Sequence, residues 1–151
     1  NAIPRHVLEV LQGLKPHRPT QSVLPPMSKL RTFIIEDNPV ILNNLIATLE
    51  ELSDVQVVGS VGSEYEAVIE LQERADQVDL VIVDVFLTSG SGLGVLRTTQ
   101  NLKLAARRVV LSNYATADMR RRCLELGADR VFDKSSELEE LIAYCDIAAK
   151  S

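Results

Sequence analysis

The sequence predicts an α/β fold in which helices cover both faces of a parallel sheet, and three observations support this prediction. Between Leu30 and Ala149, five short apolar runs alternate with segments whose apolar residues recur at helical spacing. The run Leu80–Val83 contains only aliphatic residues, which is typical of a strand buried on both faces of a parallel sheet. Each run ends at a polar residue or a glycine. Strict alternation of this kind favours a parallel sheet joined by right-handed crossovers.

The first predicted strand covers residues 30–35, and a helix follows it. Asn38 is a favourable N-cap for this helix, and Pro39 fits its first turn because that position needs no backbone N–H donor. The helix carries a single apolar stripe, which we expect to be buried: Ile41, Leu42, Leu45, Leu49 and Leu52.

The second predicted strand covers residues 55–58 and ends at Gly59. Ser63 and Glu66 have the spacing of a capping box, which predicts that the second helix begins there. We expect this helix to bury its larger apolar residues, Tyr65, Val68, Ile69 and Leu71.

The third strand is predicted over residues 80–84, and a Gly/Ser loop leads from it to a helix over residues 93–102. The fourth strand is predicted over residues 109–111. The helix after it should end at Gly127, since glycine commonly terminates helices. The buried side of that helix is marked by Met119, Cys123 and Leu126.

The fifth predicted strand covers residues 130–133. Ser136 is expected to cap the last helix, and glutamates near its N-terminus suit the positive end of the helix dipole. The residues expected to face the core are Leu138, Leu141, Ile142 and Cys145.

The composition is that of one ordinary globular domain. The 151 residues are 46% hydrophobic and 25% charged, which is enough apolar material for a substantial core. No apolar run approaches the roughly 20 residues of a membrane-spanning helix, so we expect no membrane span. The net charge of −5 argues against direct nucleic-acid binding, which usually needs a basic face. Because no signal-peptide pattern is found, we expect a cytoplasmic location.

Cysteine and histidine offer little for chemistry. Cys123 and Cys145 each lie in a helical pattern, and we interpret both as reduced core thiols. His6 and His17 are the only histidines, and both precede the predicted domain. This excludes Ser-His-Asp and Cys-His catalysis in the domain, and most zinc sites. Carboxylates, hydroxyls and lysine remain.

Residues 1–26 differ from the rest of the chain. A short helical pattern over residues 4–14 is followed by a proline-rich stretch typical of a linker. We interpret residues 1–26 as an N-terminal extension or a cloning-derived segment, because residues 8–13 resemble a viral protease cleavage site. A dimerising extension is the alternative. The packed domain is predicted over residues 27–151, with Met27 as its natural start.

Polar residues follow four of the predicted strands. Glu36 and Asp37 follow the first, Asp84 ends the third, Ser112 follows the fourth and Lys134 follows the fifth. Parallel strands bring these ends to one edge of the sheet, where open α/β sheets bind ligands. Three adjacent carboxylates need a compensating cation, and an oxygen-only ligand set favours Mg²⁺. A hydroxyl and an ammonium facing the same point suit a phosphoryl group.

This set of residues resembles the pattern of the receiver domain of two-component response regulators, over the whole of the predicted domain. The resemblance implies a (βα)5 flavodoxin-like fold with strand order 2-1-3-4-5. It also implies that Asp84 accepts a phosphoryl group from a sensor histidine kinase or a phosphotransfer protein. Lys134 would pair with the phosphoryl oxygens, and Ser112 would move toward them as the switch. Such a domain is not an enzyme, because it catalyses only its own phosphorylation and dephosphorylation.

The resemblance also assigns the metal ligands. Asp37 and Asp84 would bind Mg²⁺ directly, together with the backbone carbonyl of Phe86. Glu36 would act mainly through metal-bound water. The added phosphate, with a charge of roughly −1.5 to −2, can reorganise the loop after the fourth strand.

The sequence departs from the family pattern near the switch. Val131 stands where the family usually has an aromatic residue, and strand alternation sends Phe132 to the opposite face. Tyr114 is a candidate substitute. Asn113 replaces a residue that is commonly small, and Phe86 and Tyr114 are bulky at positions that flank the path of the hydrolytic water in the family. We therefore predict a long-lived phosphoryl group.

Two other functions are compatible with parts of the pattern. A receiver-like interaction domain that is never phosphorylated would account for Val131. An aspartate-nucleophile phosphatase of the haloacid dehalogenase type also uses an aspartate at a strand end. That family needs a second aspartate two residues later, where this chain has Phe86.

The remaining motifs are interpreted as structural. Gly90, Gly92 and Gly94 indicate turn geometry, because no nucleotide-binding glycine register is present. Residues 120–122 are three arginines, which we interpret as a solvated helix face, with a partner contact as the alternative. The chain is expected to be either a single-domain regulator or one cut before an output domain. The surface formed by the fourth helix, fifth strand and fifth helix is the candidate homodimer face.

Overall fold

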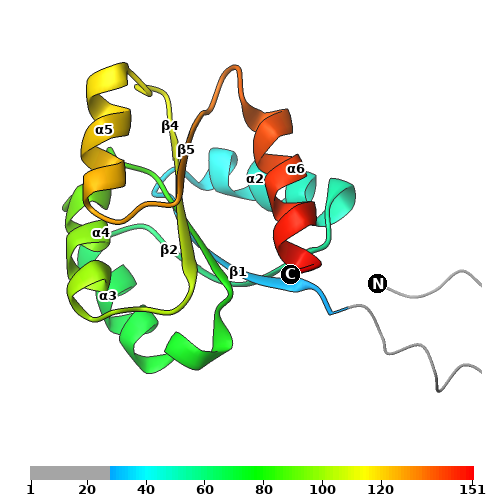
Figure 1. Ribbon diagram of the computed structural model, residues 1–151, viewed down its shortest axis with the longest axis horizontal. Helices are drawn as coiled ribbons and strands as arrows, with labels where there is room; N and C mark the ends of the chain where they lie inside the picture. Colours follow the sequence, from blue (N-terminus) through cyan, green and yellow to red (C-terminus); the bar gives the residue numbers. More distant parts are fainter. Residues whose placement is uncertain (1–27) are drawn as a thin grey trace, which may run out of the picture.

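The computed structural model describes residues 28–151, and its centre is a five-stranded parallel sheet with strand order β2-β1-β3-β4-β5 (Figure 1). The predicted fold class and strand order are therefore confirmed, whereas the predictions for residues 1–26 lie outside the described residues. The strands are β1 (Leu30–Ile35), β2 (Val55–Val61), β3 (Leu80–Val83), β4 (Arg107–Ser112) and β5 (Arg130–Asp133).

Helices cover the sheet on both sides (Figure 1). They are α2 (Pro39–Leu52), α3 (Glu64–Glu73), α4 (Gly92–Asn101), α5 (Ala117–Glu125) and α6 (Leu138–Ala149), with a short 3₁₀ turn, η2, at Ala75–Gln77. Helices α2 and α6 lie on one face, and α3, α4 and α5 lie on the other. None of the helices in residues 28–151 combines the length and hydropathy that spanning a bilayer requires.

The two faces of the sheet bury separate apolar clusters. Ile34 packs on the side of α2 and α6, whereas its neighbours Phe33 and Ile35 pack on the side of α3 to α5. The same alternation separates Val131 from Phe132, as the sequence predicted. Both clusters are continuous along the sheet, so the strand ends are anchored on both faces.

The second strand–helix unit differs from the prediction. Strand β2 continues through Gly59 to Val61, with a shift in register opposite Thr32 and Phe33. A side chain at Gly59 would lie about 2.9 Å from the Phe33 ring, which explains the glycine inside the strand. Tyr65 is 75% exposed, not buried.

The phase of α3 explains this error. Ser63 caps the helix by accepting a hydrogen bond from the Glu66 N–H, as predicted. Counted from that cap, Ala67 and Leu71 face the sheet one turn apart, and they are the buried residues of the helix. Tyr65 in the first turn points away from them.

The start of α6 also differs from the prediction, because Ser136 does not cap it. Asp133 accepts hydrogen bonds from the Ser135 and Ser136 backbone N–H groups. The N-cap position is occupied by Glu137, whose carboxylate accepts a bond from the Asp133 N–H. The turn after β5 is thus held by Asp133.

Candidate functional site

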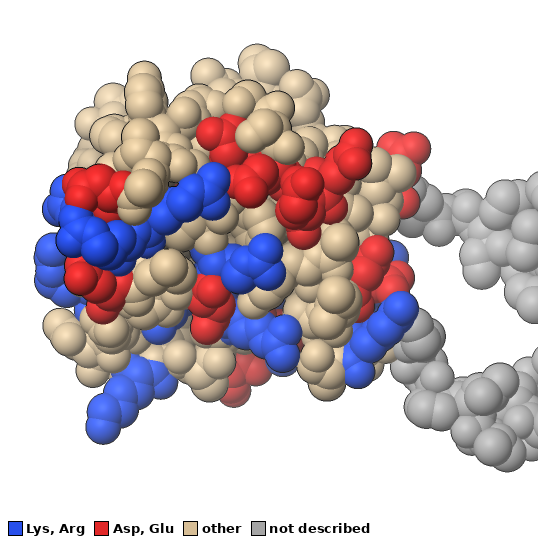
Figure 2. Space-filling view, turned by 45° about the horizontal axis from the view of Figure 1, so that its top comes forward, with Lys and Arg blue, Asp and Glu red and all other residues tan. Residues whose placement is uncertain are grey.

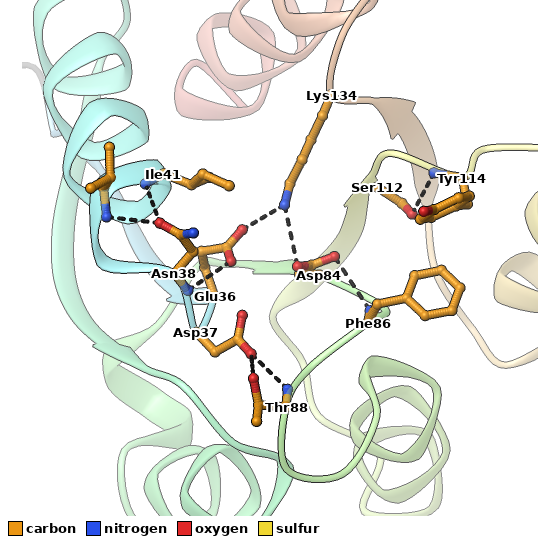
Figure 3. A network of polar contacts seen from close by, with 11 residues as sticks. Glu36, Asp37, Asn38, Ile41, Asp84, Phe86, Thr88, Ser112, Tyr114 and Lys134 are labelled. Carbon is orange, nitrogen blue, oxygen red and sulfur yellow. Dashed lines mark hydrogen bonds and ion pairs between the residues drawn. The ribbon is translucent and has the colours of Figure 1, made fainter.

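The carboxyl edge of the sheet gathers three carboxylates and one lysine (Figure 3). Glu36, Asp37 and Asp84 each place one carboxylate oxygen within 4.8 Å of the others. The Lys134 Nζ lies 2.6 Å from Glu36 Oε1 and 3.2 Å from Asp84 Oδ2. Four of the predicted site residues therefore meet at one point.

Backbone hydrogen bonds fix these residues just beyond the strand ends. The N–H of Glu36 donates to Val61 O at 3.0 Å, and the N–H of Asp84 donates to Ile35 O at 3.0 Å. The N–H of Lys134 donates to the Ser112 carbonyl at 2.9 Å. Sheet pairing thus extends one step past these strands, so the hydrogen-bonded sheet itself places Glu36, Asp84 and Lys134.

Burial sets the electrostatics of this cluster. Glu36 is 4% exposed and Asp84 is 9% exposed. Burial raises the pKa of Asp84 above its usual value; the Lys134 charge opposes this, and the Glu36 charge adds to it. Burial alone would lower the pKa of Lys134, but its hydrogen bond to Glu36 and the charge of Asp84 outweigh that effect and raise it.

The charges of the cluster do not balance. Three ionised carboxylates and one ammonium leave a net charge of −2. An all-oxygen set around a double negative charge fits a small divalent cation such as Mg²⁺. The residues present therefore suit the metal that the sequence predicted.

Asp37 is held by a residue that the sequence analysis did not single out. Thr88, in the loop after β3, donates to Asp37 Oδ2 from its backbone N–H at 2.6 Å and also from its hydroxyl. These hydrogen bonds, the hydroxyl bond first, lower the pKa of Asp37 despite partial burial. A threonine in a loop carries no spacing signal that would have predicted this contact.

Ser112 lies at the end of β4, but its side chain is not joined to the cluster. Its side chain is fully buried, and its hydroxyl accepts a hydrogen bond from the Tyr114 N–H at 3.0 Å. Among the described residues, no hydrogen bond connects this hydroxyl to Asp84 or to the Lys134 side chain. Ser112 is therefore beside the cluster and engaged with its own loop.

Tyr114 and Phe86 form an exposed aromatic pair at the mouth of the site (Figure 3). Their ring centroids are 4.9 Å apart at an interplanar angle of 71°, and the residues are 61% and 53% exposed. Asn113 lies elsewhere, lining a groove of about 300 Å³ that Lys134 also lines.

Val131 is buried under α5, and a neighbouring arginine connects it to two loops. Arg120 donates from Nε to Ala115 O and from Nη1 to Val131 O, each at 2.9 Å, and its Nη2 lies 2.5 Å from Glu137 Oε1. The prediction of a solvated helix face is therefore wrong for Arg120, because its guanidinium is bound on three sides.

The other arginines of α5 do not form a uniform basic patch. Arg121 pairs with Asp118 of the same helix, whereas Arg122 is exposed. Figure 2 shows basic side chains interspersed with acidic ones on the left, the side on which Figure 1 places α5. Only the exposed members of residues 120–122 fit the predicted solvated face.

The glycine-rich loop is packed against one carboxylate. Glu64 at the start of α3 accepts a hydrogen bond from the Ser91 N–H at 2.9 Å. A side chain at Gly94 would lie about 2.3 Å from the Glu64 carboxylate, and Gly90 has a φ of +82°. Turn geometry and close approach account for these glycines, in line with the sequence interpretation.

The sequence of this chain is similar to those of several known proteins. The family model of the response regulator receiver domain matches residues 32–146. A curated relative, the protein-glutamate methylesterase/protein-glutamine glutaminase 1 of Caulobacter vibrioides, is 28% identical over 133 residues, which cover 83% of this chain and 38% of the relative. The virulence factors transcription regulator BvgA of Bordetella pertussis is 30% identical over 112 residues, covering 74% of this chain and 52% of that protein. The chain thus spans about half the length of these relatives, or less.

A solved structure supports the fold. The crystal structure of a two-component response regulator of the LuxR family from Aurantimonas sp. SI85-9A1 has a TM-score of 0.73 and 22% identity. The match covers 82% of this chain and 86% of that one. At this identity the likeness speaks for the fold alone.

Proposed function

This chain belongs to the family of response regulator receiver domains, and we propose that it accepts a phosphoryl group on Asp84 from a sensor histidine kinase or a phosphotransfer protein. The main support is the cluster of three carboxylates joined by Lys134 at the carboxyl edge of the sheet. No other cluster of three metal-ligating side chains occurs among the described residues.

In the proposed reaction an oxygen of Asp84 attacks the phosphorus of the donor in line. A bond forms from this oxygen to phosphorus, the bond from phosphorus to the donor breaks, and an acyl phosphate results. Asp84 must be ionised to attack, so Lys134 at 3.2 Å favours the reactive form and opposes the effect of burial. Lys134 would also bind the transferred oxygens, since phosphoryl transfer depends mainly on positioning and charge neutralisation.

The net negative charge of the three carboxylates and Lys134 would favour binding of a divalent cation at this site. Asp37 and Asp84 would hold Mg²⁺ directly with the backbone carbonyl of Phe86, and Glu36 would act through water. When bound, Mg²⁺ supplies positive charge that neutralises the carboxylates and orients the phosphoryl oxygens. Glu36 and Asp84 are already placed by sheet pairing, so little reorganisation would precede binding.

The proposed switch starts from Ser112. Within residues 28–151 its hydroxyl accepts a hydrogen bond from Tyr114 and donates none, so its proton is available to a phosphoryl oxygen. Movement of Ser112 toward that oxygen would pull on the loop that contains Ala115, and Arg120 joins this loop to Glu137. With Val131 in place of an aromatic residue, we propose that this arginine carries the change to α5, β5 and α6.

The surface formed by α5, β5 and α6 is our candidate for a homodimer contact. The aromatic pair Phe86–Tyr114, with Asn113 beside it in the sequence, would restrict access of water to the acyl phosphate. We therefore propose a long-lived phosphoryl group. We further propose that residues 27–151 act as a signalling module without an activity on other substrates, whatever output domain a longer protein carries.

The proposal is tested by intact mass after incubation with Mg²⁺ and acetyl phosphate or phosphoramidate. The parent should gain the mass of one phosphoryl group, and the Asp84→Ala variant should gain none. Asp76→Ala, an exposed aspartate in η2, serves as the matched control and should behave like the parent. A parent that gains no phosphoryl mass and binds no Mg²⁺ would instead support an interaction domain that is never phosphorylated.

A further inference from the structure

We propose that Thr88 is a positioning residue for the metal site, because it holds Asp37 and the loop of Phe86 at a fixed spacing. This inference deepens the proposed function and rests on it. Two of the proposed ligands, the Asp37 carboxylate and the Phe86 carbonyl, follow different strands, β1 and β3. Their spacing therefore depends on a contact between the two loops. Thr88 supplies that contact.

The hydrogen bonds from Thr88 orient the Asp37 carboxylate. Both the backbone N–H, at 2.6 Å, and the hydroxyl donate to the same oxygen, Oδ2. The second oxygen remains on the side of Asp84, as Figure 3 shows. A Cβ atom at Gly62 would lie 3.3 Å from Cα of Asp37, so the main chain of Asp37 is also closely packed. The side chain of Asp37 is therefore held by Thr88, and its main chain is packed against Gly62.

The loop after β3 has one end fixed by other means. The Gly92 N–H donates to Val85 O at 2.9 Å, and Ser91 is bound to the carboxylate of Glu64. The tip at residues 86–88 is different. In the described part of the chain, the hydrogen bonds from Thr88 are the only ones that tie this tip to the segment after β1.

These contacts predict a specific consequence for metal binding. Without the hydroxyl, only the hydrogen bond from the Thr88 N–H joins the tip of the loop to Asp37, so the carboxylate is oriented less firmly and must be ordered when Mg²⁺ binds. Groups that orient a metal ligand typically contribute about 10-fold or more to metal affinity. Among the described residues no hydrogen bond joins Thr88 to Asp84, so the rate of phosphorylation at saturating Mg²⁺ should not depend on its hydroxyl.

The test compares three variants with the parent. Thr88→Val keeps the shape and the backbone N–H but removes the hydroxyl, whereas Thr88→Ser keeps the hydroxyl. Thr98→Val, at a half-buried threonine of α4 whose hydroxyl makes no hydrogen bond among the described residues, is the matched control. Mg²⁺ affinity is measured by calorimetry without any phosphodonor, and the phosphorylation rate is then measured against Mg²⁺ concentration. Urea unfolding of each variant serves as the control that it is folded.

We expect Thr88→Val to bind Mg²⁺ about tenfold more weakly, with the maximal phosphorylation rate unchanged. Thr88→Ser and Thr98→Val should match the parent. Equal Mg²⁺ affinity of Thr88→Val and the parent would overturn the inference and leave the proposed function intact. A lower maximal rate with unchanged affinity would also overturn it. If the parent itself bound no Mg²⁺, both the proposed function and this inference would fall.

Discussion

Replacing Asp84 with asparagine should stabilise the metal-free protein, although it removes an ion pair. The oxygens of Glu36, Asp37 and Asp84 lie within 4.8 Å of one another, and Lys134 is 3.2 Å from Asp84. At an effective dielectric constant near 20, each like-charge pair at 4.8 Å costs about 3.5 kcal/mol and the contact with Lys134 returns about 5 kcal/mol. Two repulsions therefore exceed the attraction by about 2 kcal/mol, and burial of the charge adds to the cost.

Partial exposure of Asp37 reduces its share of the repulsion, so we expect a gain of about 1–2 kcal/mol in the free energy of unfolding. The assay is urea unfolding at neutral pH with a chelator present. Asp76→Asn in η2 is the control for the change from carboxylate to amide. An Asp84→Asn variant less stable than the parent, or equal to it, would refute this electrostatic account.

The same reasoning fixes the dependence on pH and on metal. The folded-state pKa of Asp84 is raised, so protonation relieves the repulsion. The parent should therefore approach the variant in stability as the pH falls through that raised pKa. Mg²⁺ should also close the gap, because a ligand at 100 times its Kd stabilises the folded state by about 2.7 kcal/mol. A gap that persists in acid would point to a steric cause.

Three further predictions concern the surroundings of the site. Tyr114→Ala, which removes an exposed ring at the mouth, should shorten the lifetime of the phosphoryl group severalfold, as followed by intact mass over time; an unchanged lifetime would exclude shielding by this ring. Glu137→Gln should destabilise the protein at neutral pH, and this loss should disappear as the pH falls through the folded-state pKa of Glu137, which the hydrogen bond from Arg120 lowers below its usual value. Urea unfolding at several pH values checks this, and a pH-independent loss would contradict it. Gly94→Ala should cost about 1–3 kcal/mol in urea unfolding, because the new methyl group would overlap the Glu64 carboxylate, and Glu64→Ala in the same chain should restore most of the loss.

Most of the fold could be predicted because its signals are local. Strand β3 is an unbroken aliphatic run, and the caps at Asn38 and Ser63 form as their side chains predict. The positions of Asp84 and Lys134 follow from the same signals, since a polar residue directly after a buried strand of a parallel sheet must lie at its carboxyl edge.

The failures have a common physical cause, which is the conformation of loops and the phase of short helices. Tyr65 was assigned to the core because a ten-residue helix with apolar residues on two sides does not define its own phase. Thr88 and Arg120 act through contacts with segments far away in the sequence, and such contacts leave no periodic pattern. Ser136 does not cap α6 because the Asp133 carboxylate binds the Ser135 and Ser136 N–H groups in the preceding turn, and the N-cap position falls one residue later, on Glu137.

The central claim is that the phosphoryl group is carried by the carboxylate of Asp84. Reduction of the phosphorylated protein with borohydride converts an aspartyl phosphate to homoserine, and peptide mass spectrometry then locates the change. The account predicts homoserine at position 84 only, and only when Mg²⁺ and a phosphodonor were present. Homoserine at position 37, or a phosphoryl group on a serine or threonine that survives reduction, would contradict it.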